Sequence, residues 1–252
     1  MAALQASLTL NVYAPALADD DKRPLAIVHG MERALPDVRL GWTMSEKEKL
    51  IALPHRDEWV ATNRIDGGFP FLCNDDDNRV VTLTGWENPN GLAAEGPPHL
   101  QVYGRLPLDA GGIAAAVDVL EAIGDSSRAF WGHTSPEGVM RDIADQLGPK
   151  MYGRTEPPRG LPALKLPRNI PAQEIPHYLG WLNYWSAAAA MAIGFPDPAR
   201  DAELLMRAHR TPSGGWVVQL TDAPLDLDDP AHLDALKRAY ERFPVIGGRD
   251  SP

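Results

Sequence analysis

The sequence predicts an α+β fold, in which helices pack against a mostly antiparallel sheet within one loop-rich domain. Segments with the two-residue alternation of half-buried strands follow one another in short groups, with helices interspersed, which favours α+β over a doubly wound sheet. Other segments carry the 3.6-residue period of helices that are apolar on one face. The 252 residues include 24 prolines and 22 glycines, which indicates many loops.

Composition limits the function classes. Hydrophobic residues make up 44% of the chain and charged residues 23%, as in an ordinary globular protein, and no run is long enough to cross a bilayer. One cysteine, Cys73, permits neither an internal disulfide nor a cysteine-based zinc site. The net charge of -10 disfavours binding to nucleic acid or anionic membranes and predicts a basic partner.

The N-terminal residues predict a strand. Leu8, Leu10 and Val12 alternate with polar or aromatic residues, the pattern of a half-buried strand. Residues 14–18 loosely resemble a signal-peptide cleavage site, but no Lys or Arg precedes Lys22. We therefore expect a cytoplasmic protein.

The next elements are a helix and three strands. A helix is expected after Asp19–Asp21, whose acidic side chains favour the positive helix end. Phe69–Cys73 and Val80–Thr84 predict a hairpin around the turn Asn74–Asn78, and His99–Arg105 predicts a third strand.

A second helix is expected from Asp109 to Gly124, followed by a strand over Arg128–Thr134. Ser135-Pro136 has the pattern of an N-cap with proline at the first helical position, which predicts a helix to about Leu147.

Residues 148–176 contain seven prolines, so they cannot form a regular helix or a central strand. This segment connects an N-terminal part (1–147) with a C-terminal part (177–252). We expect the whole chain, 1–252, to be a single domain, with strands from both parts in one sheet.

The C-terminal part opens with an aromatic strand, Leu179–Ser186. Helices are expected over Ala187–Ala192 and Asp197–His209, and a strand over Trp216–Thr221. A final helix is expected after Asp229, its N-cap, with an apolar stripe made by Leu233, Leu236, Ala239, Tyr240 and Phe243.

The sequence lacks the common catalytic and metal-binding motifs. Its seven histidines are scattered without metal-ligand spacing. Asp75–Asn78 resembles the start of an EF-hand loop, but Val80 and Trp86 occupy the places of the required glycine and carboxylate. Nor is Pro36-Asp37 followed by a carboxylate and lysine in the register of a restriction-type nuclease. We therefore expect no catalytic residues, no metal and no cofactor, although a site assembled from distant residues would not show in sequence.

The distribution of acidic and aromatic residues gives the candidate partner-binding residues. From Asp66 to Glu95 six acidic residues, including Asp75–Asp77, face one cation, Arg79, and five lie between Asp222 and Asp234 with no cation among them. Solvated loops are the ordinary interpretation, whereas an acidic surface with nearby aromatics also suits the basic cleft of a nucleic-acid enzyme. At strand spacing, at least one of the aromatics should be in the core. The candidates are Asp75, Asp76, Asp77, Trp181, Tyr184, Trp185, Asp222, Asp226 and Asp228.

The C-terminal half also resembles a known family. The block Gly180–Ser186, the Gly214-Gly215 turn, Thr221-Asp222 and the step Asp229–His232 are together similar to the immunity protein 52 family. The resemblance covers residues 178–243 and continues more weakly upstream. The Pro-rich segment and the Ala187–Pro198 insertion depart from the family pattern.

The resemblance implies a cytoplasmic binding protein without catalysis. Members of the family neutralise polymorphic toxins, commonly nuclease domains of restriction-endonuclease fold. The resemblance therefore implies that the partner is a cognate toxin, a basic nuclease whose active cleft this protein occludes. The alternative is an α+β enzyme or small-ligand-binding protein whose site is not visible in sequence.

Overall fold

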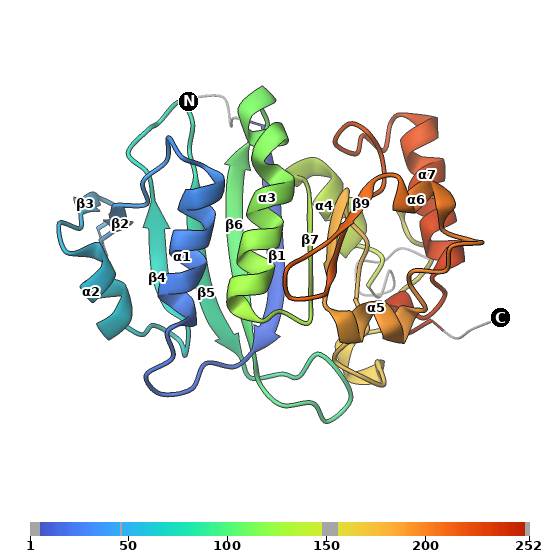
Figure 1. Ribbon diagram of the computed structural model, residues 1–252, viewed down its shortest axis with the longest axis horizontal. Coiled ribbons are helices and arrows are strands. Elements are labelled where there is room, and N and C mark those ends of the chain that lie inside the picture. Colours follow the sequence, from blue (N-terminus) through green and yellow to red (C-terminus); the bar gives the residue numbers. More distant parts are fainter. Residues whose placement is uncertain (1–5, 46, 148–155, 250–252) are drawn as a thin grey trace.

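The computed structural model describes residues 6–45, 47–147 and 156–249. Among these residues, ten strands form one sheet in the order β3-β2-β4-β5-β6-β1-β7-β8-β10-β9, and neighbouring strands pair antiparallel (Figure 1). Strands from before and after the Pro-rich segment share this sheet, which confirms the predicted α+β class.

The strands are β1 (Ser7–Pro15), β2 (Trp42–Met44), β3 (Leu50–Ala52), β4 (Phe69–Cys73), β5 (Thr82–Asn88), β6 (His99–Pro107), β7 (Trp131–Pro136), β8 (Leu182–Trp185), β9 (Ala208–Arg210) and β10 (Trp216–Gln219). The helices are α1 (Arg23–Ala34), α2 (Arg56–Thr62), α3 (Ala110–Ser127), α4 (Glu137–Ala144), α5 (Ala187–Ile193), α6 (Ala202–Leu205) and α7 (Pro230–Arg242).

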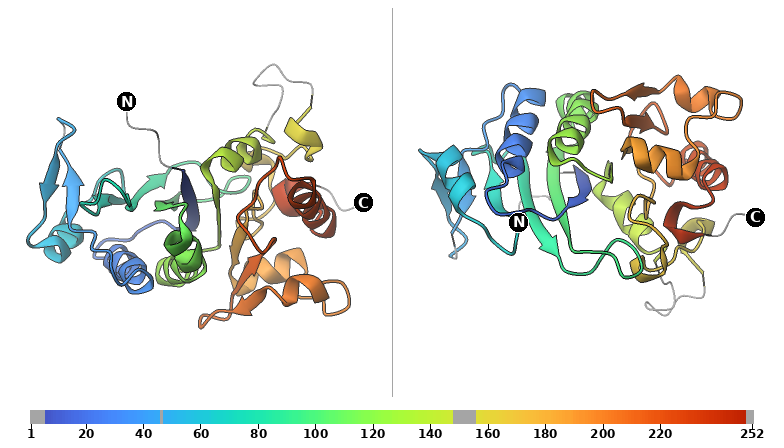
Figure 2. Two further views of the ribbon diagram at one scale, coloured as in Figure 1. Left: turned by 90° about the horizontal axis from the view of Figure 1, so that it is seen from above. Right: turned by 60° about the horizontal axis from the view of Figure 1, so that its bottom comes forward.

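Helices α1 and α3 cover one face of the sheet (Figure 2). Leu8, Leu10 and Val12 of β1 are buried, and β1, β6, β7 and β8 all contact α3. Helix α3 begins at Asp109, whose carboxylate accepts a hydrogen bond from the Gly112 amide at 2.7 Å. A Cβ on Gly30 of α1 would lie 3.2 Å from the Ala122 carbonyl oxygen, so the two helices are in close contact there.

Two successive residues of β8 point to opposite faces of the sheet and show which elements cover each face. The Tyr184 hydroxyl donates to Asp125 of α3 at 2.8 Å, whereas the Trp185 ring packs against Phe243, just after α7, at 5.3 Å. Helices α4 and α7 therefore lie on the face away from α3. They cover its β7–β8 half, and among the described residues no helix lies over β4, β5 and β6 there (Figure 2).

Several predicted elements are confirmed. The β4–β5 hairpin and helix α3 form as expected, and β1 extends from Ser7 to Pro15. Helix α7 begins after Asp229, whose carboxylate accepts from the Ala231 amide at 2.8 Å.

The predicted N-cap at Ser135 is wrong. Strand β7 continues to Pro136, and α4 begins at Glu137. The Ser135 hydroxyl instead accepts a hydrogen bond from the Trp181 amide at 2.9 Å. Ser135 is therefore part of strand β7, although the local sequence pattern predicts that it caps a helix.

The predicted helix over Asp197–His209 is also wrong. Only α6, Ala202–Leu205, is helical, and Ala208–Arg210 pairs with β10. The Asp201 carboxylate is buried and pairs with Arg242 of α7 at 2.5 Å, which anchors this segment as a series of turns.

Three elements were not expected from the sequence. Strands β2 and β3 have three residues each, and α2 has seven, so each is too short to repeat its hydrophobic period often enough to be recognised. In the Pro-rich segment, residues 148–155 lie outside the described residues. The described remainder contains short 3₁₀ turns at Pro158–Gly160 and Pro167–Asn169 and an isolated β-bridge between Leu164 and Leu147.

We expect Asp229→Ala to lower the free energy of unfolding by about 1 kcal/mol, because the α7 N-cap would be lost. Urea unfolding followed by circular dichroism measures this change. Asp234→Ala, at an exposed position within α7, is the control and should change stability by less. Equal effects would contradict the capping role.

Candidate functional site

One face of β5, β6 and β1 is only partly covered. Because neighbouring residues of a strand point to opposite faces, Trp86, Gln101 and Tyr13 form one row across these strands, and Thr84, Tyr103 and Asn11 form the next. Trp86 and Tyr103 are half-buried. We call this surface, made by Asn11, Thr84, Trp86, Gln101, Tyr103 and Arg105, the open face.

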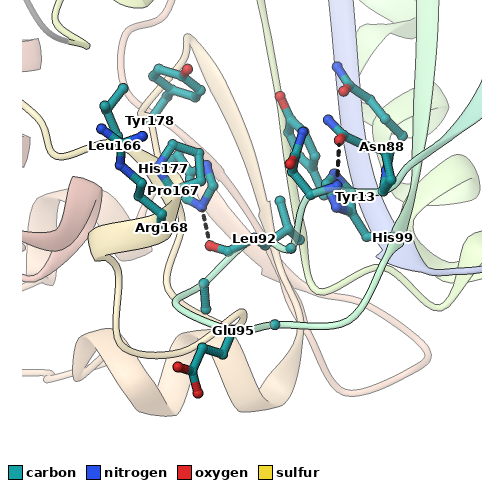
Figure 3. A pocket seen from close by; sticks show the side chains of 16 residues that line it. Tyr13, Asn88, Leu92, Glu95, His99, Leu166, Pro167, Arg168, His177 and Tyr178 are labelled. Carbon is teal, nitrogen blue, oxygen red and sulfur yellow. Dashed lines mark hydrogen bonds between the residues drawn. The ribbon is translucent and has the colours of Figure 1, made fainter.

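A pocket of about 730 Å³ lies where the open face meets the start of β6 (Figure 3). Residues on the sheet form one side, and the loops 89–96 and 166–168 form the others. Tyr13, His99, His177 and Tyr178 contribute rings to its wall, and Asn88 and Gln101 contribute amides.

An aromatic cluster supports this wall. Tyr13 packs against Trp131 with ring centroids 4.1 Å apart, and its ring lies 5.9 Å from His99, 6.4 Å from His133 and 6.3 Å from His177. The Nε2–H of His177 donates to the Leu92 carbonyl at 2.7 Å, so Nε2 carries the proton (Figure 3). This bond joins the loop after β5 to the end of the Pro-rich segment.

Burial keeps the three imidazoles neutral. It lowers the pKa of His133 to about 3, and the neighbouring His177 contributes to the shift. Burial likewise lowers the pKa of His177 to about 4, although the Leu92 carbonyl opposes the shift. The pKa of His99 is also lowered by burial, against the opposing effect of the Asn90 backbone. At neutral pH the cluster therefore carries no charge.

Two of these histidines lack hydrogen-bond partners. Neither ring nitrogen of His99 or His133 makes a hydrogen bond of good geometry within the described ranges. A buried polar atom without a partner costs free energy, and such atoms are uncommon in folded proteins. His99 lines the pocket, so a molecule in the pocket can reach it.

Asp75, Asp76 and Asp77 lie in the exposed loop between β4 and β5. Asp76 accepts hydrogen bonds from the Asn78 and Arg79 amides at 2.9 and 3.2 Å, which shapes the turn. The Arg79 guanidinium pairs with Asp109 at 3.1 Å. The three carboxylates remain at the surface.

Asp222, Asp226 and Asp228 are exposed between β10 and α7. No cation lies near these residues in the sequence, but the fold brings one to them: Arg159 of the Pro-rich segment pairs with Asp228 at 2.7 Å. Arg207 lies 3.7 Å from Asp222. Part of this cluster's charge is therefore compensated.

The two acidic clusters lie at the same end of the sheet. The strand register places Thr82, where β5 begins, and Gln219, where β10 ends, at that end. Four strands separate β5 from β10, which puts the clusters roughly 24 Å apart across the sheet. The pocket lies at the opposite end. The structure thus brings the Asp75–Asp77 loop and the pocket to opposite ends of the open face.

The three aromatic candidates belong to the core. Trp181 is 2% exposed, Tyr184 1% and Trp185 0%, so none of them is an exposed anchor for a partner. The Trp181 indole N–H donates to the Thr221 carbonyl at 2.9 Å. The physical reason is that β8, which begins one residue after Trp181, lies between β7 and β10, with α3 on one face and the end of α7 on the other.

Trp86 and Tyr103 on the open face were not among the candidates. For Tyr103 the signal was the alternation of polar and apolar residues through β6, which extends to Pro107. Trp86 had no such signal, because the alternation of β5 ends at Thr84: Trp86 shares a face with Thr82 and Thr84, and Glu87 shares the other with Leu83. Strand alternation marks a residue as facing away from the core, but it does not tell whether a helix covers that face.

No group of three or more His, Cys, Asp or Glu within the described ranges is placed to hold a metal ion. Cys73 is buried, and burial raises its pKa, so the thiol is not activated. Within the same ranges, none of the helices has the length and apolar character needed to span a membrane.

Residues 19–251 match the model of a family described as a domain of unknown function (DUF5953), and the chain belongs to that family. No curated protein matches the sequence. Among solved structures, the fold is similar to the Pseudomonas aeruginosa T6SS protein PA0821, with a TM-score of 0.54 and 14% identity. The similarity covers 94% of this chain and 73% of that one, and at this identity it shows a shared fold.

The neutral histidines predict a loss of stability in mild acid. Their pKa in the unfolded chain is about 6.5, so the unfolded state binds more protons as the pH falls below that value. We expect the free energy of unfolding to fall between pH 6.5 and 5 by up to about 1.4 kcal/mol per pH unit for each of His133 and His177. Urea titrations at several pH values measure this slope.

His133→Phe should reduce the slope, because it removes one buried imidazole. His55→Phe, at an exposed position, controls for the loss of a histidine. A slope that is the same in both variants and in the original protein would contradict the assignment.

Proposed function

We propose that this protein is an immunity protein that binds a toxin domain of nuclease type and occludes its active cleft. The observation that carries the proposal is the open face, where half-buried Trp86 and Tyr103 lie among polar side chains, with the exposed Asp75–Asp77 loop at one end of that face. Aromatic residues in a polar surround are typical of protein-binding surfaces, and carboxylates attract a basic partner.

The chemistry of the chain supports binding over catalysis. The buried imidazoles near the pocket are neutral, and within the described residues no carboxylate forms a hydrogen bond with His99, His133 or His177. A general base needs such a partner or a poised pKa to work at neutral pH. The net charge of -10 opposes direct binding to nucleic acid and favours a protein that carries basic residues.

Two comparisons support the same proposal. The C-terminal half resembles the immunity protein 52 family, and the similar solved structure is described as a T6SS protein. An inhibitor that protects its own cell from a nuclease acts where that cell's nucleic acid lies. We therefore propose that the protein is cytoplasmic.

In this mechanism the Asp75–Asp77 loop attracts the basic toxin, and the open face then makes the close contact. Exposed charges at the rim of an interface raise the association rate. Desolvated aromatics at its centre slow dissociation. Asp222, Asp226 and Asp228 form a second, partly compensated acidic surface, which we propose as a further contact for a large partner.

The test is to co-express the protein with the toxin-like product of an adjacent gene. If the proposal holds, the protein restores growth, purifies as a complex and blocks nuclease activity in proportion to the amount added. Continued toxicity with both proteins soluble would contradict the proposal for that toxin.

We expect replacement of Asp75, Asp76 and Asp77 by Asn to lower the association rate with the toxin and to weaken its salt dependence, because surface charges act on encounter. Stopped-flow or surface plasmon resonance at several salt concentrations measures both. Asn substitution of Asp19, Asp20 and Asp37, three exposed residues outside this loop, is the control with the same change of charge. If both variants behave alike, the 75–77 loop has no specific role.

We expect Trp86→Ala and Tyr103→Ala to raise the dissociation rate from the toxin, each by about tenfold or more, as loss of a central aromatic does. Thermal unfolding of each free variant controls for lost packing. Phe130→Ala, a half-buried aromatic outside the open face, is the comparison and should leave dissociation unchanged. Unchanged dissociation of the two open-face variants would place the interface elsewhere.

A further inference from the structure

The pocket at the end of the open face is uncharged inside. Glu95 and Arg168, one of each sign, are exposed and belong to the two loops that bound it. The deeper residues Tyr13, His99 and His177 are buried and neutral (Figure 3). A charged group placed against these deeper residues would meet no compensating charge, and the net charge of -10 further opposes an anion.

His99 is the residue that calls for a ligand. His99 is 4% exposed and lines the pocket, and neither ring nitrogen makes a hydrogen bond of good geometry among the described residues, although the Asn90 backbone is close enough to oppose the lowering of its pKa. A neutral imidazole offers one donor and one acceptor. A molecule with an acceptor and a donor on the same edge would satisfy both.

Two amides extend this pattern on adjacent strands. Asn88 is the register partner of His99, and Gln101 lies two residues further along β6. Asn88 Oδ1 accepts from the Asn90 amide at 3.0 Å, and Gln101 Nε2 donates to Asn11 at 3.2 Å. These bonds leave Asn88 Nδ2 as a donor and Gln101 Oε1 as an acceptor toward a ligand.

The shape of the wall favours a planar molecule. Rings of Tyr13, His177 and Tyr178 line the pocket, and aromatic side chains of this kind stack on nucleobases. Asn and Gln amides pair with the donor and acceptor of an adenine edge. A volume of about 730 Å³ lies within the range of small-molecule sites.

We propose that this pocket binds an uncharged planar heteroaromatic molecule with a donor–acceptor edge, of the class of purine nucleosides. This inference goes beyond the proposed function and does not depend on it. His99 would hold the heterocyclic edge, and Asn88 and Gln101 would complete its recognition.

The experiment is isothermal titration calorimetry of the full chain with adenosine, with ribose and adenosine 5′-monophosphate as comparison probes. Adenosine should bind, ribose should not, and the added phosphate should weaken binding. His99→Phe keeps a ring of similar shape but removes both nitrogens, so adenosine affinity should fall by at least about tenfold. His55→Phe, exposed and outside the pocket, should bind as the original protein does.

Thermal unfolding separates binding from folding. Because His99→Phe removes buried nitrogens without partners, its melting temperature in the absence of ligand should be unchanged or higher, while the increase caused by adenosine disappears. If His99→Phe is destabilised instead, Gln101→Met is the second test. It removes the Oε1 acceptor at a half-buried position, so it should also weaken adenosine binding. The proposal is overturned if adenosine does not bind at millimolar concentration, if ribose or the monophosphate binds equally well, or if the deciding variant keeps full affinity.

Discussion

Strand β1 is bonded along both edges, to β6 through nine residue pairs and to β7 through six, and the sheet depends on this insertion. In the chain, β7 is the next strand after β6, and α3 connects the two. In the sheet, β1 lies between them. The β3-to-β6 half and the β7-to-β9 half are joined through this strand. Its partners lie about a hundred residues away, so ordering them requires the closure of long loops.

The two faces of β1 contact different parts of the protein. Leu8, Leu10 and Val12 contribute to the buried face under α3, where α1 and α3 are packed side by side. Tyr13 points to the other face and packs against Trp131. The end of one strand thereby positions the aromatic cluster, and the cluster in turn supports the pocket wall.

On the face away from α3, the C-terminal half is covered and the N-terminal half is open. The covered half takes the largest rings, including Trp185 with Phe195 and Phe243 around it. The open half carries Thr84, Gln101 and Tyr103, which tolerate water. This division leaves polar and aromatic side chains at the surface of the open half while the core stays covered.

The ring nitrogens of His99 and His133 and the hydroxyl of Thr134 are buried polar atoms without a hydrogen bond of good geometry among the described residues. Nearby polar groups such as the Trp131 indole N–H and the His177 Nε2–H both reach backbone carbonyls. Departures of this kind are concentrated at functional sites, where a polar group is held ready for a ligand at some cost in stability.

Elements with a local signal could be predicted from the amino-acid sequence. Alternation predicted β1, the β4–β5 hairpin and β6, and capping chemistry placed the start of α7 at Asp229, because backbone period and first-turn hydrogen bonds involve neighbouring residues. Tertiary structure decided the rest. It buried Trp181, Tyr184 and Trp185, paired Asp228 with a distant Arg159, and gathered His99, His133 and His177 from separate elements around Tyr13. Coverage of a face, charge compensation and clustering all depend on contacts between residues far apart in the chain, which no local pattern encodes.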